Sequence, residues 1–303
     1  MSMLPAPRSF GAWVLAARPA TLAVAVASVL VGAAVASAVG TVRLLPLVLA
    51  LFGAILIQIG TNFANDVFDH EKGADTAERI GPTRAVSAGL LTARDVRFGM
   101  VFAFGLATVI GAYLISLSGW QIAVIGVVSI ASGIAYTGGP YPLGYNGLGD
   151  VFVFLFFGII GVAGTAFVAH GSVPAAAWLS GIPVGALATN VLVVNNVRDH
   201  VGDVKAGKRT LVVRFGRTFG VAEYLVMLLL AAVSIIFLAV TGLASPLVAI
   251  ALIPLSFGLR LFRTIRSETD GPTLNRCLVS SAKLMLAVTV FLAVGLALGP
   301  RVS

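Results

Sequence analysis

Nine long apolar runs, separated by short polar connections, make up most of this sequence. Each run approaches the roughly 20 residues that a helix needs to cross the hydrocarbon core of a bilayer. Lipid tolerates no unpaired backbone groups, and the apolar–polar alternation of a membrane barrel is absent, so we expect helices. The predicted fold class is therefore all-α, a polytopic membrane protein with about nine transmembrane helices in one bundle. The predicted spans are residues 20–38, 44–64, 97–117, 121–137, 150–170, 175–194, 220–240, 245–262 and 279–298.

The first apolar run has a second possible interpretation. A basic start, an apolar stretch from Ala20 and the small-residue triplet Ala36-Ser37-Ala38 are also typical of a secretory signal peptide. The stretch is longer than the apolar region of most signal peptides. We therefore interpret it as the first spanning helix, which is not cleaved.

Lys and Arg are distributed unevenly between the connections, and this distribution predicts an orientation. Cytoplasmic segments of membrane proteins are enriched in both residues. If the N-terminus is cytoplasmic, only Arg43 and Arg301 of the 20 basic residues fall outside the cytoplasmic segments. We expect a multi-pass protein of the cell membrane, with its N-terminus in the cytoplasm and its C-terminus outside.

The composition supports a membrane protein with one chemically equipped face. Only 11% of the 303 residues are charged, whereas a soluble domain has about 25%. Basic cytoplasmic loops account for the net charge of +8, so we expect no nucleic-acid partner. All 12 acidic residues also fall on the predicted cytoplasmic side. This arrangement argues against a cation-coupled transporter, in which polar groups would be distributed across the bilayer.

A polar stretch rich in Asp follows the second apolar run. On a helix, Asn65 and Asp69 are four residues apart and share a face, whereas Asp66 lies about 100° away. Gly73 is expected to end this helix, because glycine readily adopts the left-handed conformation found there. Asp75 would then follow on the loop.

A second polar stretch follows the sixth run. It places Asn195, Asp199 and Asp203 at positions i, i+4 and i+8, in one helical stripe. The shared Asn-x-x-x-Asp pattern predicts a single domain, residues 1–303, with two pseudo-repeated halves, roughly 1–145 and 146–303. Each half would contribute half of one site. Coincidence in short polar loops is the alternative.

The ligand chemistry of these stretches points to a hard cation. Asp and Asn oxygens suit Mg²⁺, which binds through one or two carboxylates together with substrate phosphates. Carboxylates alone would repel a diphosphate, so metal and nearby Lys and Arg are needed. The three histidines form no spaced set, which argues against zinc. The alternative is that the acids are solvated loop residues, and we favour it for Glu71, Glu78, Asp95, Glu268 and Asp270.

A loop rich in Gly and Pro connects the two halves. It carries Tyr136, Tyr141 and Tyr145, and aromatic faces stabilise cations such as the allylic cation left by a departing diphosphate. A belt of tyrosines at the membrane interface is the alternative. Asp150, which follows the loop, is expected to help orient an acceptor.

These motifs together resemble those of the UbiA-type intramembrane prenyltransferases. NDxxDxxxGxD from Asn65, followed by RxGPTR from Arg79, is similar to the family's first aspartate-rich motif, and NNxRDxxxDxxAGKRT from Asn195 to the second. The sequences YTGGPYPLGYNGLGD and ARPATL look like the branch that prenylates 1,4-dihydroxy-2-naphthoate in menaquinone synthesis. The resemblance covers nearly the whole chain.

The resemblance implies a helical bundle around a central cavity, which is open toward the cytoplasm. It implies Mg²⁺-dependent transfer of a polyprenyl group from polyprenyl diphosphate to 1,4-dihydroxy-2-naphthoate, with loss of carbon dioxide. A sister enzyme acting on 4-hydroxybenzoate, homogentisate, haem or a chlorophyllide is the alternative. The predicted metal ligands are Asn65, Asp66, Asp69, Asp75, Asn195, Asp199 and Asp203; the diphosphate-binding residues are Asn65, Lys72, Arg79, Arg84, Arg198, Lys208 and Arg209; the catalytic residues are Asp69, Asp199, Tyr136 and Asp150.

Overall fold

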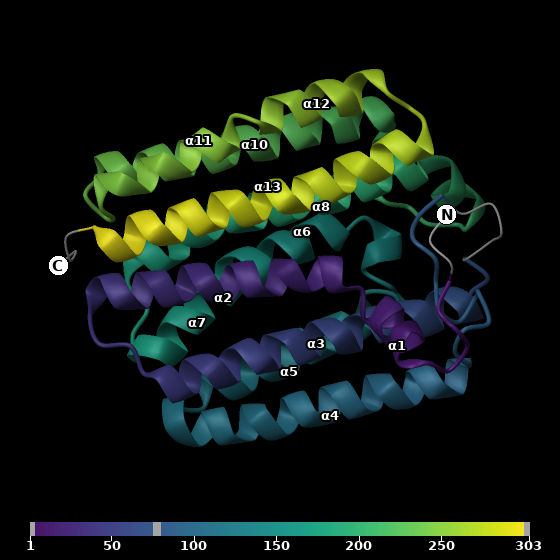
Figure 1. The fold of residues 1–303 in the computed structure, drawn as a ribbon, viewed down its shortest axis with the longest axis horizontal. Coiled ribbons are helices and arrows are strands. Elements are labelled where there is room, and N and C mark those ends of the chain that lie inside the picture. Colours follow the sequence, from purple (N-terminus) through teal and green to yellow (C-terminus); the bar gives the residue numbers. More distant parts are fainter. Residues whose placement is uncertain (1–3, 75–79, 300–303) are drawn as a thin grey trace.

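The computed structural model describes residues 4–74 and 80–299, and within these ranges it contains helices and no strands. Long helices run side by side along the bundle, and the described parts of the chain begin and end at opposite ends of it (Figure 1). The helices are α1 Phe10–Ala17, α2 Pro19–Val39, α3 Leu44–Glu71, α4 Ala93–Ser118, α5 Gln121–Ala135, the 3₁₀ turn η1 Gly144–Asn146, α6 Gly149–Val153, the π-helical segment η2 Phe154–Ile160, α7 Gly161–His170, α8 Ala175–Lys205, α9 Leu211–Phe215, α10 Arg217–Val240, the 3₁₀ helix η3 Pro246–Ala251, α11 Leu252–Leu255, α12 Gly258–Ser267 and α13 Gly271–Leu298.

This is a multi-pass membrane protein. Eight helical stretches within the described residues are long and apolar enough to cross a bilayer, and α5 is a shorter apolar helix. Each of the nine predicted spans corresponds to one of these nine stretches. The fifth span comprises α6, η2 and α7, and the eighth comprises η3, α11 and α12. The all-α prediction is confirmed.

Two helices extend well beyond their apolar parts, and both carry a polar stretch. Helix α3 extends beyond the predicted apolar span 44–64 to Glu71, and α8 extends beyond the predicted span 175–194 to Lys205. Backbone hydrogen bonding continues through Asn and Asp, although hydropathy no longer signals a helix. Gly73 follows the end of α3 with φ of +67°, as predicted for a helix end.

Glycines allow α8 to approach the π-helical segment η2 very closely. A Cβ atom added to Gly158 would collide with the backbone of Gly181 and Gly185. Small residues of this kind let helix backbones meet in membrane proteins, where packing is a main source of association. The contact fixes the wall formed by η2 against the helix that carries the second polar stretch.

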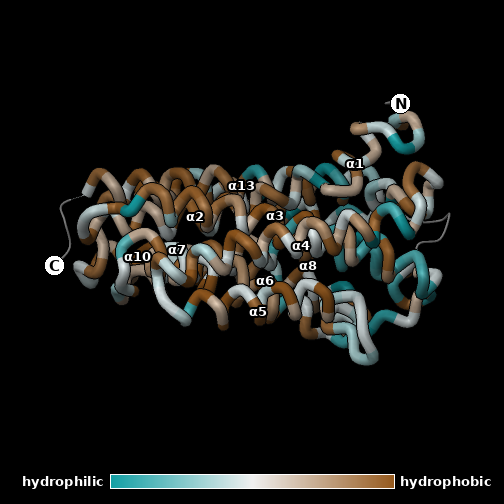
Figure 2. The backbone as a smooth tube through the Cα atoms, turned by 90° about the horizontal axis from the view of Figure 1, so that it is seen from below, coloured by the Kyte–Doolittle hydropathy of each residue, from teal (hydrophilic) through white to brown (hydrophobic). Residues whose placement is uncertain are grey.

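Polar residues gather at the end of the bundle where the described chain begins, whereas hydrophobic residues dominate its length (Figure 2). Arg43 lies at the opposite end. Its guanidinium donates to the carbonyls of Leu117 at 3.2 Å, Phe167 at 3.2 Å and Val168 at 2.8 Å. These carbonyls belong to the last turns of α4 and α7, so Arg43 ties two helix C-termini to the start of α3.

Candidate active site

A cavity of about 890 Å³ lies among α2, α3, α4, α5, the α6–η2–α7 stretch and α8. Most of its wall is apolar. At the polar end of the bundle it is lined by acids, amides and cations from both polar stretches. From the predicted site these are Asn65, Asp69, Arg84, Tyr136, Asn195, Asp199, Asp203 and Lys208. The structure therefore brings the two aspartate-rich stretches to one cavity.

Asp69 is the centre of the first half-site. Only 1% of the residue is exposed. Arg84 Nη2 donates to Asp69 Oδ2 at 2.7 Å, and the hydroxyl of Tyr145 donates to Asp69 Oδ1 at 2.7 Å. Lys208 Nζ lies 3.8 Å from Oδ1. A single buried carboxylate is thus balanced by cations that come from two distant loops.

Asn65 and Lys72 complete this half-site through Thr137. The hydroxyl of Thr137 donates to Asn65 Oδ1 at 2.9 Å, and Lys72 Nζ donates to the Thr137 carbonyl at 2.5 Å. The pKa of Lys72 is lowered, mainly by desolvation and also by the charge of Lys208. The neighbouring charge of Asp69 opposes this shift. Lys72 does not line the cavity itself.

Arg198 organises the second half-site. Its Nε and Nη2 donate to the two carboxylate oxygens of Asp199, at 2.8 and 2.6 Å, and Nη2 also donates to Asn195 Oδ1 at 2.7 Å. The Arg198 side chain is fully buried and is not among the cavity-lining residues. Its observed role is to hold Asp199 and Asn195, rather than to present a cation to the cavity.

Lys208 connects the two half-sites. Its Nζ lies 3.7 Å from Asp203 Oδ1 as well as 3.8 Å from Asp69 Oδ1. The ring of Tyr145 is contacted by two cations, with Lys208 Nζ at 4.9 Å and Lys72 Nζ at 4.8 Å from its centroid. Such contacts are favourable because the face of the ring carries negative charge.

Asp66 has a different environment from the other acids of the first stretch. Its carboxylate accepts the backbone N–H groups of Ala85 at 3.1 Å and Val86 at 3.4 Å, and it does not line the cavity. Metal ligation by Asp66 stays a prediction, and the contacts observed for its two oxygens fix a loop. That loop carries Arg84 to Asp69.

Two further predicted residues lie outside the cavity wall. Asp150 is 5% exposed and is the second residue of α6. The first residue, Gly149, packs close to Tyr136, because a Cβ added to this glycine would lie 2.8 Å from the Tyr136 hydroxyl oxygen. The side chain of Arg209 is exposed, while its backbone N–H donates to the Tyr145 carbonyl at 2.7 Å. Asp75 and Arg79 lie outside the described residues.

Several acids that we expected to be surface residues have structural partners. Glu71 forms an ion pair with Arg97. Asp95 and Asp270 accept backbone N–H groups at the starts of α4 and α13, where negative charge is favourable. These contacts fit acids that stabilise helix ends and loops.

The oxygen atoms that face the cavity suit Mg²⁺. Those of Asn65, Asp69, Asn195, Asp199 and Asp203 are carboxylate or amide oxygens. In the described part of the chain, no three Asp, Glu, His or Cys side chains converge on one point. This donor set fits an ion that takes some of its ligands from substrate phosphates rather than one enclosed by protein.

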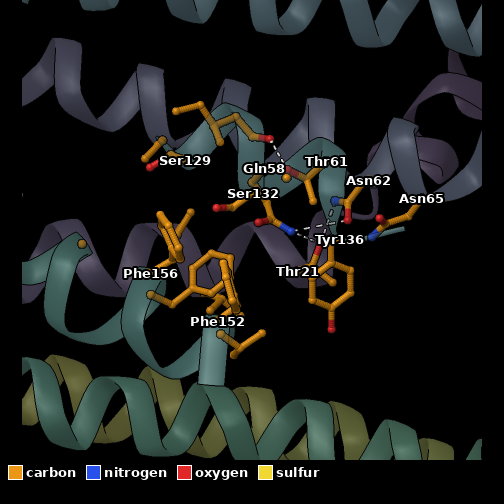
Figure 3. Close-up of a pocket in the computed structure, with 18 of the residues that line it drawn as sticks. Thr21, Gln58, Thr61, Asn62, Asn65, Ser129, Ser132, Tyr136, Phe152 and Phe156 are labelled. Carbon is orange, nitrogen blue, oxygen red and sulfur yellow. Dashed lines mark hydrogen bonds between the residues drawn. The ribbon is translucent and has the colours of Figure 1, made fainter. Parts of the chain in front are cut away.

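A polar stripe along α3 was missed by the sequence reasoning. Asn62 Nδ2 donates to Thr21 Oγ1 at 2.8 Å, and Gln58 Nε2 donates to Asn62 Oδ1 at 3.4 Å (Figure 3). Gln58, Asn62, Asn65 and Asp69 are spaced by four, three and four residues, so they share one helix face. This spacing in an apolar helix is a signal that the sequence contains.

The role of Tyr145 was also missed. Sequence placed it on the Gly- and Pro-rich loop without distinguishing it from Tyr141, a residue that is 59% exposed. Only the folded loop shows that Tyr145 contacts Asp69 and two lysines.

Comparison with known proteins identifies the family. Residues 25–279 match the family described as the UbiA prenyltransferase family. The chain belongs to the UbiA prenyltransferase family. It is 40% identical to the 1,4-dihydroxy-2-naphthoate octaprenyltransferase of Haemophilus influenzae over 73% of this chain and 74% of that one. It is 35% identical to the Mycobacterium tuberculosis protein of the same name over 96% of this chain and 98% of that one.

Solved structures of the UbiA family share the fold. A UbiA homologue from Archaeoglobus fulgidus bound to DMAPP and Mg²⁺ superposes with a TM-score of 0.66 at 14% identity, over 93% of this chain and 99% of that one. An apo homologue from Aeropyrum pernix gives the same TM-score at 15% identity, over 90% and 96%. The protein is thus a prenyltransferase with the family's membrane fold.

Proposed function

We propose that this protein transfers a polyprenyl group from polyprenyl diphosphate to 1,4-dihydroxy-2-naphthoate, with loss of carbon dioxide. The product is demethylmenaquinone in its reduced, quinol form. Relatives that carry this activity in their names are 32–40% identical over most of the chain. The observation that carries the proposal is a cavity with two facing acidic half-sites at one end and an apolar wall beyond them.

The shape of the cavity suits an amphiphilic donor. The diphosphate belongs at the polar end, between Asp69 and Asp199, where Lys208 and Arg84 supply positive charge. The tail belongs against apolar residues such as Phe156 and Ile125, which line the wall beyond the polar end. Burying the tail there is favoured by the hydrophobic effect.

Mg²⁺ is part of this proposal. Asn65, Asp69, Asn195, Asp199 and Asp203 would hold it, and its charge would balance the departing diphosphate. Asp69 and Asp199 would then share their carboxylate oxygens between Mg²⁺ and the arginines that donate to them now, Arg84 and Arg198. Asp66 is left out of the proposed set because it does not line the cavity and its carboxylate accepts two backbone N–H groups.

The side chains of the cavity would act by position and charge. Lys208 and Arg84 favour cleavage of the bond between the allylic carbon and the diphosphate oxygen, because they stabilise the negative charge that develops. Tyr136 lines the cavity and would offer an aromatic face to the positive carbon. Exclusion of water by the apolar wall protects this carbon from hydrolysis.

The acceptor ring supplies the electrons for the new bond. Its carboxylate-bearing carbon attacks the allylic carbon while diphosphate leaves. The bond to the carboxylate then breaks, carbon dioxide departs, and its electron pair restores the aromatic ring. No protein nucleophile takes part, so the enzyme contributes orientation and electrostatic stabilisation.

We further propose that the polar end of the bundle faces the cytoplasm of the cell membrane. The uneven distribution of Lys and Arg supports this orientation. A water-soluble naphthoate would then enter from the cytoplasm, while the prenyl donor would arrive from the bilayer.

An acceptor panel tests the proposed reaction. Purified protein would be incubated with octaprenyl diphosphate, Mg²⁺ and either dihydroxynaphthoate, 4-hydroxybenzoate or homogentisate, and the products identified by mass spectrometry. We expect prenylated naphthoquinol lacking the carboxylate, with no more than trace products from the other acceptors. Preference for another acceptor would contradict the naphthoate assignment, and ion flux in proteoliposomes without prenyl transfer would instead support a transporter.

A further inference from the structure

Asn275, on the first turns of α13, contacts residues next to both half-sites. It does not belong to either aspartate-rich stretch. Its Oδ1 accepts a hydrogen bond from Arg198 Nη1 at 2.8 Å, and its Nδ2 donates to the carbonyl of Ile80 at 3.1 Å. One amide side chain thus contacts the arginine of the second half-site and the loop that leads to Arg84 in the first.

We propose that Asn275 is a positioning residue, which sets the orientation of Asp199 through Arg198. This inference rests on the proposed metal- and diphosphate-binding role of the site. It adds α13 to the segments that the sequence assigns to the site.

The Arg198 contact carries the first step of the argument. Arg198 is 5% exposed, and its guanidinium grips both oxygens of Asp199. With Nη2 also bound to Asn195, Nη1 has Asn275 as its partner in the described residues. Without that acceptor a buried N–H group would lack a hydrogen bond, which favours rotation of the guanidinium away from its present position. Asp199 would lose its fixed orientation with it.

The Ile80 contact carries the second step, because it fixes Asn275 itself. Gly271 lies directly against the side chain of Ile80, so the start of α13 and this loop are packed together. Four residues later the same loop carries Arg84, which donates to Asp69. The Asn275 amide therefore fixes the start of α13, the loop from Ile80 to Arg84 and the Arg198 side chain relative to one another.

The chemistry of the amide explains why this residue type fits. Asn has one acceptor and one donor group on a short side chain, and the two contacts here use one of each. Leucine has similar size and offers neither group. Aspartate keeps the acceptor for Arg198 and lacks the donor for Ile80.

Direct metal binding tests the inference. Mn²⁺ binding in the presence of geranyl diphosphate, without acceptor, would be measured by electron paramagnetic resonance on the full chain. We expect Asn275→Leu to weaken Mn²⁺ binding about tenfold or more, since residues that orient metal ligands contribute effects of this size. Asn275→Asp should lose less affinity than Asn275→Leu, because the acceptor for Arg198 remains although the donor to Ile80 is lost. The KM for dihydroxynaphthoate should stay within about twofold.

Arg276→Gln is the matched control, since this exposed neighbour on the same turn contacts Thr273 rather than an acid of the site. Its Mn²⁺ affinity should equal that of the wild type. Unchanged Mn²⁺ affinity in Asn275→Leu, or equal losses in the Leu and Asp variants, would overturn the positioning role. So would a fall in melting temperature that lowers every parameter together. A wild-type protein that binds no Mn²⁺ would contradict the proposed function, and this inference with it.

Discussion

Asp66, Asp69 and Asp199 are each held by a cation or by backbone N–H groups. Asp69 is paired with Arg84 and Asp199 with Arg198, and both pairs are largely buried. A buried carboxylate without such a partner would be very costly. The pairing keeps these carboxylates in place, and metal binding would have to compete with it.

Asp66 and Asp69 differ by only three positions, and we expect their substitutions to have different effects. Asp66→Ala removes the acceptor of two backbone N–H groups and should cost about 1–3 kcal/mol of stability. The Mg²⁺ concentration for half-maximal turnover should not change. Thermal unfolding and a Mg²⁺ titration of activity check this. A shift of tenfold or more in the Mg²⁺ requirement would return Asp66 to the set of ligands.

Tyr145 combines a hydrogen bond to Asp69 with a ring that contacts two lysines. Tyr145→Phe removes the bond to Asp69 and keeps the ring, so we expect a fall in kcat of about tenfold, equivalent to about 1.4 kcal/mol. Tyr145→Leu also removes the lysine contacts and should raise the KM for prenyl diphosphate. Steady-state kinetics of both variants distinguish these effects. Equal kinetics for the two variants would show that the ring has no role.

At the residue scale, the sequence indicates which types of side chain meet but not their partners. The i, i+4 spacing correctly places Asn65 and Asp69 on one cavity face and separates Asp66 from them. It does not reveal that Asp66 binds the backbone of residues 85 and 86, or that Arg198 holds Asp199. Those contacts depend on the path of a loop and on a rotamer, which no local pattern specifies.

At the scale of elements, hydropathy predicts where helices cross the membrane but not where they end. The ends of α3 and α8 lie in polar sequence, because a helix is defined by backbone hydrogen bonds and needs no apolar side chains outside lipid. This extension matters for the site. It carries Asp69 and Asp199 beyond the apolar wall while they remain on rigid helices.

Arg43, at the end of the bundle away from the acids, is expected to contribute to the stability of the fold. Arg43→Met removes hydrogen bonds to three carbonyls of α4 and α7, and we expect a loss of about 2–4 kcal/mol. Turnover per folded molecule should change little, since the acids lie at the other end of the helices. Unfolding in detergent and activity at low temperature measure the two quantities. A selective loss of turnover at unchanged stability would contradict this structural role.

At the scale of the whole molecule, we expect the two ends of the bundle to be accessible from opposite sides of the membrane. With the single cysteine removed by Cys277→Ser, Ser267→Cys should react with a membrane-impermeant maleimide only from the cytoplasmic side, and Thr241→Cys only from outside. Both positions are exposed and lie at opposite ends of the α10–α12 hairpin. The reverse pattern in cells and inverted vesicles would overturn the proposed orientation. The division into two pseudo-repeated halves stays a prediction.

The central claim is that two half-sites from distant parts of the chain hold one metal–diphosphate group. A Mg²⁺ titration of naphthoate prenylation in the wild type, Asp69→Asn, Asp199→Asn and the double variant tests it most directly. We predict metal-dependent turnover in the wild type and losses of at least about 100-fold in each single variant, with little further loss in the double, because groups that act as a unit are not additive. Metal-independent turnover, or a single variant as active as the wild type, would contradict the account.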